Sequence, residues 1–194
     1  DRAVEACALA QEPVLQAALS KAQEAGRRLH FMGLVTQGGV HSQQAHLDAR
    51  CEAAAKAGVA GVVVHAFTDG RDAAPRKAAT YIAELEGVLE ETGGRIGSVH
   101  GRYYAMDRDK RWERVARTYN CLVKGEGGHF PTAAAGIADH YDRDITDEFI
   151  EPFTVGEADA TIKEGDVVIC FNFRTDRCRE ITMALTQEDF PEAG

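Results

Sequence analysis

Short apolar runs recur along the chain and are separated by longer amphipathic segments. The runs are rich in β-branched and aromatic residues and cover 29–35, 61–69, 98–104 and 166–173. Near-continuous apolar runs of this length are typical of strands that are covered by helices on both faces. The pattern therefore predicts four strands of a largely buried sheet.

The segments between the runs repeat apolar residues at helical spacing. The segment 76–92 has one continuous apolar face, made of Ala78, Tyr81, Ile82, Leu85, Val88 and Leu89. The segment 43–57 has a similar face, made of Leu47, Cys51, Ala54 and Ala55. We expect Ser42 to cap this second helix and Gly58 to end it. A further helix is predicted near 132–142, and the stretch "GEGGHF" (125–130) is interpreted as a turn.

This alternation of strands and helices defines the expected fold class. Parallel strands need crossover connections, which are usually helices. We therefore predict an α/β fold, a three-layer domain with a mostly parallel sheet flanked by helices. No internal repeat, low-complexity tract or linker divides the sequence, so residues 1–194 are expected to form one domain.

Composition narrows the possible classes of protein. The formal net charge is 22 − 31 = −9, which argues against non-specific nucleic-acid binding but leaves room for a local anion pocket. No apolar run approaches the roughly 18 residues of a membrane span, and the first residues given do not have the basic-then-apolar pattern of a leader, so neither a membrane protein nor a secreted one is expected. The five cysteines are scattered and form no C-x-x-C pair, so neither disulfides nor zinc are expected. A cytoplasmic protein that contacts no membrane is the simplest expectation.

Charged residues follow each predicted strand. In an open α/β sheet the ligand crevice lies beyond the carboxyl ends of the strands. These ends are followed by "TQGGVHS", "DGRD", "GRYYAMDR" and "NFRTDR", which supply His41, Arg71, Asp72, Arg102, Arg108, Arg174 and Arg177. The planar guanidinium fork suits phosphate and carboxylate groups. The sequence thus predicts a pocket for a small anion.

Two alternatives remain open at this point. Each arginine could instead pair with a nearby aspartate, a reading that suits Asp69–Arg71–Asp72 and Arg174–Asp176–Arg177. The basic and aromatic segment 101–115 could be a nucleic-acid patch or the solvated face of a helix. Trp112 begins a helical apolar pattern that continues to Val123, which favours a helix capped by Asp107 or Asp109, its tryptophan facing the core. The histidines show no metal-binding spacing, so no metal site is expected in this chain.

Four motifs together resemble a known family. "LHFMGLVTQGGVHSQQAHL", "VHAFTDGRDAAP", "GRYYAMDRDKRWERV" with "GEG" shortly after, and "FNFRTDRCREIT" are similar to the cofactor-independent (2,3-bisphosphoglycerate-independent) phosphoglycerate mutases. The motifs occur in order from about residue 14 to 190. Two of the motifs depart from the common pattern: Thr36–Gln37 replace a Ser-Asp pair, and Thr175 and Cys178 stand where small residues or proline are commoner.

The resemblance implies an enzyme with two domains that interconverts 3-phosphoglycerate and 2-phosphoglycerate through a phosphoserine intermediate. It implies that an alkaline-phosphatase-like domain, absent from this chain, holds the nucleophilic serine and two divalent metals, usually manganese. Residues 1–194 would be the inserted substrate-binding (phosphotransferase) domain, with no requirement for 2,3-bisphosphoglycerate and no activity alone.

The same resemblance assigns roles to residues. His41, Arg71, Asp72, Arg102, Arg108, Arg174 and Arg177 would line the substrate site, and Asp72 would be the catalytic residue that handles the proton of the substrate hydroxyl. The implied partners are phosphoglycerate and the missing metal domain of the same polypeptide, with neither nucleic acid nor membrane. The alternative is a non-catalytic module that binds anions or nucleic acid; a related phosphotransferase of the alkaline phosphatase superfamily is a more distant possibility.

Overall fold

The computed structural model describes residues 11–24 and 26–187, and these contain one six-stranded sheet. Its strand order is β4-β5-β3-β2-β1-β6. The bounds are β1 Leu29–Leu34, β2 Val63–Thr68, β3 Arg95–Gly101, β4 Gly128–Phe130, β5 Phe153–Val155 and β6 Val167–Cys170. Every neighbouring pair is parallel except β3 and β5, which run antiparallel. The predicted α/β fold with a mostly parallel sheet is therefore confirmed.

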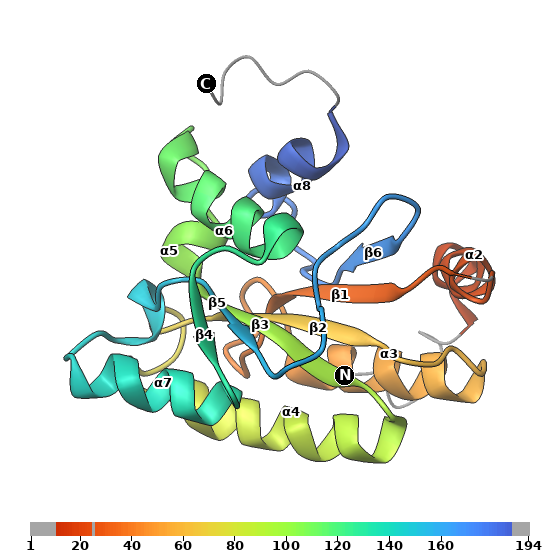
Figure 1. The fold of residues 1–194 in the computed structure, drawn as a ribbon, viewed down its shortest axis with the longest axis horizontal. Coiled ribbons are helices and arrows are strands. Elements are labelled where there is room, and N and C mark those ends of the chain that lie inside the picture. The colour runs from red at the N-terminus through yellow and green to blue at the C-terminus, as the bar shows by residue number, and fades with distance from the viewer. Residues whose placement is uncertain (1–10, 25, 188–194) are drawn as a thin grey trace.

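Helices cover both faces of this sheet, which gives three layers (Figure 1). One face is covered by α3 (Gln44–Lys56), α4 (Ala78–Thr92) and α7 (Ala133–Asp142). The opposite face is covered by α5 (Arg102–Ala105), α6 (Trp112–Lys124) and α8 (Arg179–Thr186). Helix α2 (Pro13–Ala22) packs into the first layer, and a 3-10 helix, η2 (Asp147–Phe149), lies beside α5.

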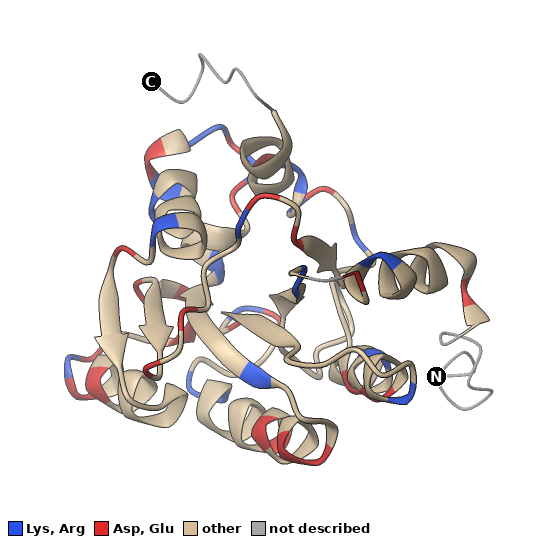
Figure 2. Ribbon diagram, turned by 45° about the vertical axis from the view of Figure 1, so that its right-hand side comes forward, with Lys and Arg blue, Asp and Glu red and all other residues tan. Residues whose placement is uncertain are grey.

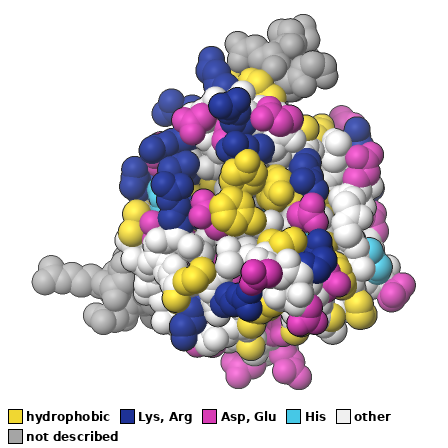
Figure 3. Space-filling view, turned by 90° about the vertical axis from the view of Figure 1, so that its left-hand side faces the viewer, with side chains coloured by type: hydrophobic (Ala, Val, Ile, Leu, Met, Phe, Trp, Pro, Cys, Tyr) yellow, Lys and Arg dark blue, Asp and Glu magenta, His cyan; other side chains and the backbone are white. Residues whose placement is uncertain are grey.

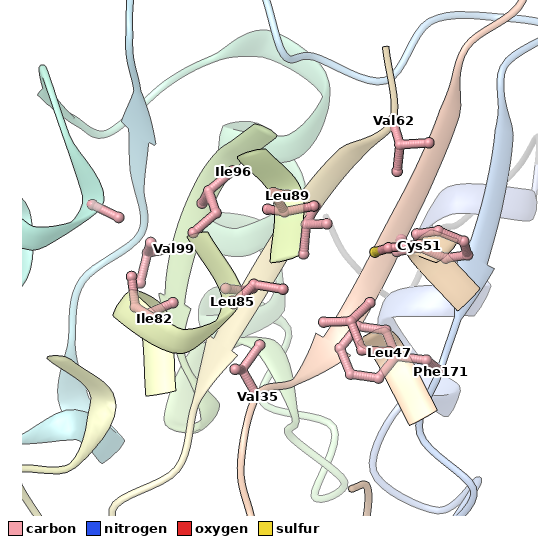
Figure 4. Close-up of a cluster of buried hydrophobic side chains, with 14 of the residues drawn as sticks. Val35, Leu47, Cys51, Val62, Ile82, Leu85, Leu89, Ile96, Val99 and Phe171 are labelled. Atoms are coloured by element: carbon pink, nitrogen blue, oxygen red, sulfur yellow. The ribbon is translucent and has the colours of Figure 1, made fainter. Parts of the chain in front are cut away.

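Two apolar clusters fill the space between the layers. In the first, Leu47 and Cys51 of α3 and Leu85 of α4 pack against the sheet (Figure 4). In the second, Leu122 of α6 and Ile181 of α8 do the same on the other face. Alternate residues of β1 enter the two clusters, which explains why all six of its residues are buried.

Most predicted elements are present, but some details were wrong. Contrary to the prediction, Ser42 is not the N-cap of α3: its hydroxyl donates to the carbonyl of Leu34, the N-cap position is Gln43, and no side chain caps the helix. Ala55 is exposed, while Ala53 takes its place in the first cluster. Gly58 does end the helix region, with φ +76°.

Three further differences concern strands. β3 begins and ends three residues earlier than predicted, because residues from Arg102 onward turn into α5. "GEGGHF" is a turn only in its first half, since Gly128–Phe130 form β4. β5 was not predicted, because a strand of three residues carries too little periodicity to stand out.

The charges are spread over helices and loops, and the strands are almost free of them (Figure 2). Within the described ranges, no helix has the length and apolarity needed to cross a membrane. Local arrangement of charge, rather than net charge, must therefore define any anion site.

Candidate anion-binding site

The predicted residues meet beyond the carboxyl ends of β1, β2, β3 and β6. Gly101, the last residue of β3, lies close to η2. A side chain would not fit at this position, because a Cβ there would lie 2.5 Å from the Glu148 carbonyl oxygen. The N–H of Gly101 donates to the Ile150 carbonyl at 2.8 Å, which fixes the point at which the chain turns into α5. Arg102 is therefore the first residue of α5 rather than a strand residue, and it reaches the site from that position. Figure 3 shows this side of the molecule, where basic and acidic side chains together border a patch of apolar ones.

A buried ion cluster forms the base of the site. Arg102 is 5% exposed, and its Nη1 donates to Asp69 Oδ1 at 2.8 Å and to Asp72 Oδ2 at 2.7 Å. Asp69 also accepts from the Thr36 hydroxyl at 2.7 Å and from the backbone N–H groups of Arg71 and Asp72 at 3.2 and 2.9 Å. Asp69 thus ties together the ends of β1, β2 and β3.

His41 links this cluster to the loop after β6. Its Nε2 lies 3.7 Å from Asp72 Oδ2, and its Nδ1 lies 4.0 Å from Asp176 Oδ1. Asp176 in turn pairs with Arg108 at 3.3 Å and with Arg174 at 3.2 Å. These two arginine side chains are 48% and 49% exposed, so most of their donors face solvent.

The remaining two arginines line a small cavity beside Arg102. Its volume is about 180 Å³, and its walls include Arg71, Arg102 and Arg177. Arg71 lies 3.6 Å from Glu148, and Arg177 Nε is buried without a hydrogen-bond partner among the described residues. A buried guanidinium donor without a partner is costly, so an acceptor on a bound anion would satisfy it.

Burial and charge shift the pKa values at the site. Burial lowers the pKa of His41, and the Arg102 charge lowers it further, against the opposing effect of Asp72. Burial raises the pKa of Asp69, but hydrogen bonds from the Asp72 N–H, the Thr36 hydroxyl and Arg102 outweigh burial and bring it below its usual value. Near neutral pH the site therefore combines a neutral imidazole with ionised Asp69.

The structure brings all seven predicted residues together, and it also bears on the alternatives. Pairing with aspartate is real for Arg102, Arg108 and Arg174, so these arginines have both an internal partner and a place at the site. Sequence reasoning missed the part played by Asp69 and Thr36. The signal for them was weak, because a strand-end aspartate or threonine is common in any α/β fold.

The basic and aromatic segment divides as the helical spacing predicted. Trp112 is half-buried and packs against the second cluster. The Arg114 guanidinium lies 3.9 Å from the Tyr103 ring centre, and that of Arg117 lies 4.7 Å from the Tyr104 ring centre. Neighbouring arginines thus occupy the tyrosine faces, which does not favour base stacking. Asp107 accepts from the Arg111 N–H at 2.9 Å, which orders the turn before α6 without being its N-cap.

A second hollow of about 390 Å³ lies elsewhere, between α6, α7 and the β4–β5 edge. It is larger than the arginine-lined cavity, but its two arginines, Arg117 and Arg143, both pair with Glu151. That internal neutralisation makes it a poorer anion site. Among the described residues, no group of three or more His, Cys, Asp or Glu side chains could hold a metal ion.

The fold and the converging arginines define an α/β domain with a cationic site at the carboxyl ends of its strands. Comparison with known proteins then identifies the family: residues 1–194 match the model for "BPG-independent PGAM N-terminus (iPGM_N)", and the chain belongs to that family.

Its relatives are named as mutases. The 2,3-bisphosphoglycerate-independent phosphoglycerate mutase of Bacteroides thetaiotaomicron is 47% identical over 192 residues, which is 97% of this chain and 38% of the relative. That of Myxococcus xanthus is 50% identical over 197 aligned residues, covering 99% of this chain and 38% of the relative. A crystal structure of Leishmania mexicana phosphoglycerate mutase, at low cobalt concentration, superposes with a TM-score of 0.92 and 34% identity, over 98% of this chain and 37% of that one. The chain therefore spans little more than a third of the length of these relatives.

Proposed function

We propose that residues 1–194 are the substrate-binding domain of a two-domain, 2,3-bisphosphoglycerate-independent phosphoglycerate mutase. The parent enzyme would be an isomerase of glycolysis and gluconeogenesis in the cytoplasm, interconverting 3-phosphoglycerate and 2-phosphoglycerate through a phosphoserine intermediate. The observation that carries the proposal is the convergence of five arginines and His41 at one sheet edge in a chain of this family. The relatives' names support independence from 2,3-bisphosphoglycerate.

In this proposal the arginines hold the glycerate while its phosphoryl group leaves and returns. Arg102 is fixed by two carboxylates, so its remaining donors have a set direction before the ligand arrives. Preorganised donors need little rearrangement when charge develops on the ligand, which is a general source of catalytic advantage. Arg71 and Arg177 would supply further donors from the cavity wall.

Asp72 and His41 are the groups placed to handle a proton of the substrate hydroxyl. Asp72 shares one oxygen with Arg102 and lies 3.7 Å from the His41 imidazole. Because burial and the Arg102 charge lower the pKa of His41, the ring is neutral near pH 7, and its single N–H can point toward the Asp72 carboxylate. We assign Asp72 as the proton acceptor and His41 as the group that orients it.

The divalent metals implied for the parent enzyme, manganese by preference, have no fitting set of ligands in the described part of this chain. The proposal therefore assigns the metals and the serine nucleophile to the rest of the polypeptide, an alkaline-phosphatase-like domain that would be this domain's partner. The substrate-binding step is the part of the reaction that these residues would perform.

Charge reversal in the full-length mutase tests this assignment. Arg102→Glu and Arg174→Glu should each lower kcat/KM by at least a hundredfold, because each replaces an anion-binding donor with a repelling carboxylate. Arg143→Glu is the matched control: it reverses an arginine that is 45% exposed and lines the second hollow rather than the arginine-lined cavity, and activity should stay within twofold.

Circular dichroism of each variant would show whether the fold survives. Near-normal turnover in folded Arg102→Glu and Arg174→Glu would contradict the substrate-binding role. Mutase activity of the 194-residue chain by itself, with manganese added, would contradict the assignment of the nucleophile to another domain.

A further inference from the structure

Asp176, in the loop after β6, lies between two arginines and a histidine of the site. One of its oxygens, Oδ2, accepts from Arg108 Nη1 at 3.3 Å and from Arg174 Nη2 at 3.2 Å. The other oxygen, Oδ1, lies 4.0 Å from His41 Nδ1. One carboxylate therefore serves three groups, and none of the three distances reaches the roughly 2.7–2.9 Å of a strong charge-assisted hydrogen bond.

Two atoms that face each other here have no hydrogen-bond partner. Asp176 Oδ1 is buried without a partner among the described residues, and so is His41 Nδ1. Buried polar atoms of this kind are rare and costly in native proteins. A ring N–H and a carboxylate oxygen suit each other, so shortening their separation from 4.0 Å to the roughly 2.9 Å of a hydrogen bond would satisfy both.

The carboxylate is the partner with room to move. The His41 side chain is only 4% exposed, and its backbone carbonyl accepts from the N–H groups of Phe173 and Arg174 at 2.9 and 3.4 Å. The Asp176 side chain is 35% exposed. A rotation of the Asp176 side chain can therefore close the gap while the imidazole stays in place.

The arginines that hold Asp176 are bound more loosely than Arg102. Arg102 is 4% exposed in its side chain and donates to two carboxylates at 2.7 and 2.8 Å. The side chains of Arg108 and Arg174 are 48% and 49% exposed. Water and salt screen ion pairs as exposed as theirs, so such pairs contribute little. The contacts of Arg108 and Arg174 with Asp176 are thus the ones that a bound anion can replace.

We propose that Asp176 is an exchangeable positioning residue of the anion site. Before an anion binds, its carboxylate holds Arg108 and Arg174; a bound phosphate group then replaces it there and releases it toward His41. A phosphate group has a charge of about −2 and three acceptor oxygens, so it satisfies two guanidinium groups better than the single oxygen Oδ2 does. This inference rests on the proposed function, which places phosphoglycerate at these arginines.

The exchange has a consequence for the two ring nitrogens of His41. A released Asp176 carboxylate favours the neutral ring with its N–H on Nδ1, so the ring loses a proton at Nε2 and gains one at Nδ1 by exchange with water. Nε2, which lies 3.7 Å from Asp72 Oδ2, then has a free lone pair. That lone pair can accept a hydrogen bond from Asp72 once Asp72 has taken up the proton of the substrate hydroxyl. Binding of the anion thereby prepares His41 to stabilise protonated Asp72.

Binding of inorganic phosphate to the 194-residue chain, followed by nuclear magnetic resonance, tests the exchange. Asp176→Ala should bind phosphate about fivefold more tightly than the unchanged chain, because Arg108 and Arg174 lose a competing carboxylate. Asp139→Ala is the matched control. It removes a carboxylate that is 46% exposed and pairs with Arg143 at 3.0 Å, away from the arginine-lined cavity, so affinity should stay within twofold. Affinity in Asp176→Ala equal to or below that of the unchanged chain would overturn the exchange.

The ring nitrogens of His41 give a second reading that simple structural support would not change. In a chain with ¹⁵N-labelled histidine, the His41 signals are identified by their loss in His41→Gln. Saturation with phosphate should move the N–H from Nε2 to Nδ1 in the unchanged chain and in Asp139→Ala, but not in Asp176→Ala. The same tautomer with and without phosphate in the unchanged chain would overturn the release of Asp176 to His41.

Kinetics of the full-length mutase separate this inference from the proposed function. Asp176→Ala should lower KM for 3-phosphoglycerate and also lower kcat about tenfold, because substrate binding loses a competitor while His41 loses its partner. Unchanged KM and kcat in this variant, beside a large loss in Arg102→Glu, would overturn the exchange alone. Near-normal turnover in folded Arg102→Glu would instead overturn the proposed function and, with it, the role of Asp176 in the reaction.

Discussion

Asp69 shows how one buried side chain can organise a whole site. It is 2% exposed and accepts hydrogen bonds from Thr36, Arg102 and two backbone N–H groups of the loop after β2. Removing one partner of a buried ion pair leaves the other charge uncompensated, which typically costs about 3–5 kcal/mol. Asp69 is therefore a positioning residue for Arg102 and for the loop that carries Arg71 and Asp72.

The substitution Asp69→Asn should weaken anion binding at the proposed site by more than its effect on stability explains. The amide keeps the shape but loses the charge that holds Arg102, so we expect affinity for 3-phosphoglycerate to fall about tenfold, or ~1.4 kcal/mol. Isothermal titration calorimetry on the 194-residue chain measures this, beside urea unfolding.

Asp147→Asn is the matched control. Asp147 is 1% exposed and accepts from the Lys77 and Ala78 N–H groups at 2.7 and 2.8 Å, but it does not contact Arg102. This variant should lose stability without losing affinity. Equal loss of affinity in both variants would show that Asp69 acts only through general stability.

For single residues, the sequence predicts which side chains lie together at the site but not which hydrogen bonds hold them in place. Arginine and histidine stand out at strand ends because their chemistry is distinctive there. The roles of Asp69 and Thr36 depend on the distance between the ends of β1, β2 and β3, which no local pattern contains. Ser42 fails as a cap for a similar reason, since a tertiary partner, the Leu34 carbonyl, takes its hydroxyl.

Adjacent strands are joined by a line of buried polar side chains. His30 Nε2 lies 2.9 Å from Asp166 Oδ2, and His30 Nδ1 lies 2.9 Å from His65 Nε2. Ser98 Oγ lies 2.7 Å from both His65 Nδ1 and His100 Nε2. Every hydrogen bond in this line can be made when the three imidazoles are neutral and each donates toward Asp166. The line is thus suited to neutral histidines.

Stability should consequently fall as the pH drops below the ordinary histidine pKa. Burial lowers the pKa of His30, His65 and His100, the last to about 3. At pH values between the native and the unfolded pKa, the unfolded chain binds more protons than the native one, so the free energy of unfolding rises with pH there. The contribution of these histidines to stability is therefore present above about pH 6.5 and is lost as the pH falls below it. Each histidine that stays neutral in the native protein should lower the free energy of unfolding by about 2 kcal/mol between pH 7 and pH 5.

Urea unfolding at several pH values measures this slope. His100→Leu should reduce the loss between pH 7 and pH 5 by about the contribution of one histidine. His129→Asn, which changes an exposed residue of β4, should leave the slope unchanged. A wild-type free energy of unfolding that is flat over this range would contradict neutral histidines in the native protein.

Helices and strands were predicted correctly where the apolar pattern extends over many residues. The α4 face from Ala78 to Leu89 extends over three turns and was assigned correctly. The end of β3 was not, because the sequence continues with Tyr103 and Tyr104, which favour strands locally. The antiparallel contact of β5 with β3, and the carbonyl of Ile150 at Gly101, decide the boundary instead.

At the scale of the whole molecule, the two apolar clusters share one sheet. Successive residues of β1 point into opposite clusters: Phe31 into the first, Met32 into the second. Loss of one helical layer would expose one face of every central strand to water. Fold class followed from the sequence because strand–helix alternation admits few architectures. The position of β6 beside β1 could not be deduced, since pairing between distant segments leaves no local signal.

Both layers should therefore unfold in one transition. Trp112, the sole tryptophan, packs against the second cluster, so its fluorescence reports on the α6–α8 layer, while far-ultraviolet circular dichroism reports on all helices and strands. In urea the two signals should give the same midpoint. Leu85→Ala in the first cluster and Leu122→Ala in the second should each lower stability by about 2–5 kcal/mol and shift both signals equally. If Leu122→Ala shifted only the fluorescence midpoint, the second layer would be unfolding on its own, and the shared sheet would not couple the two clusters.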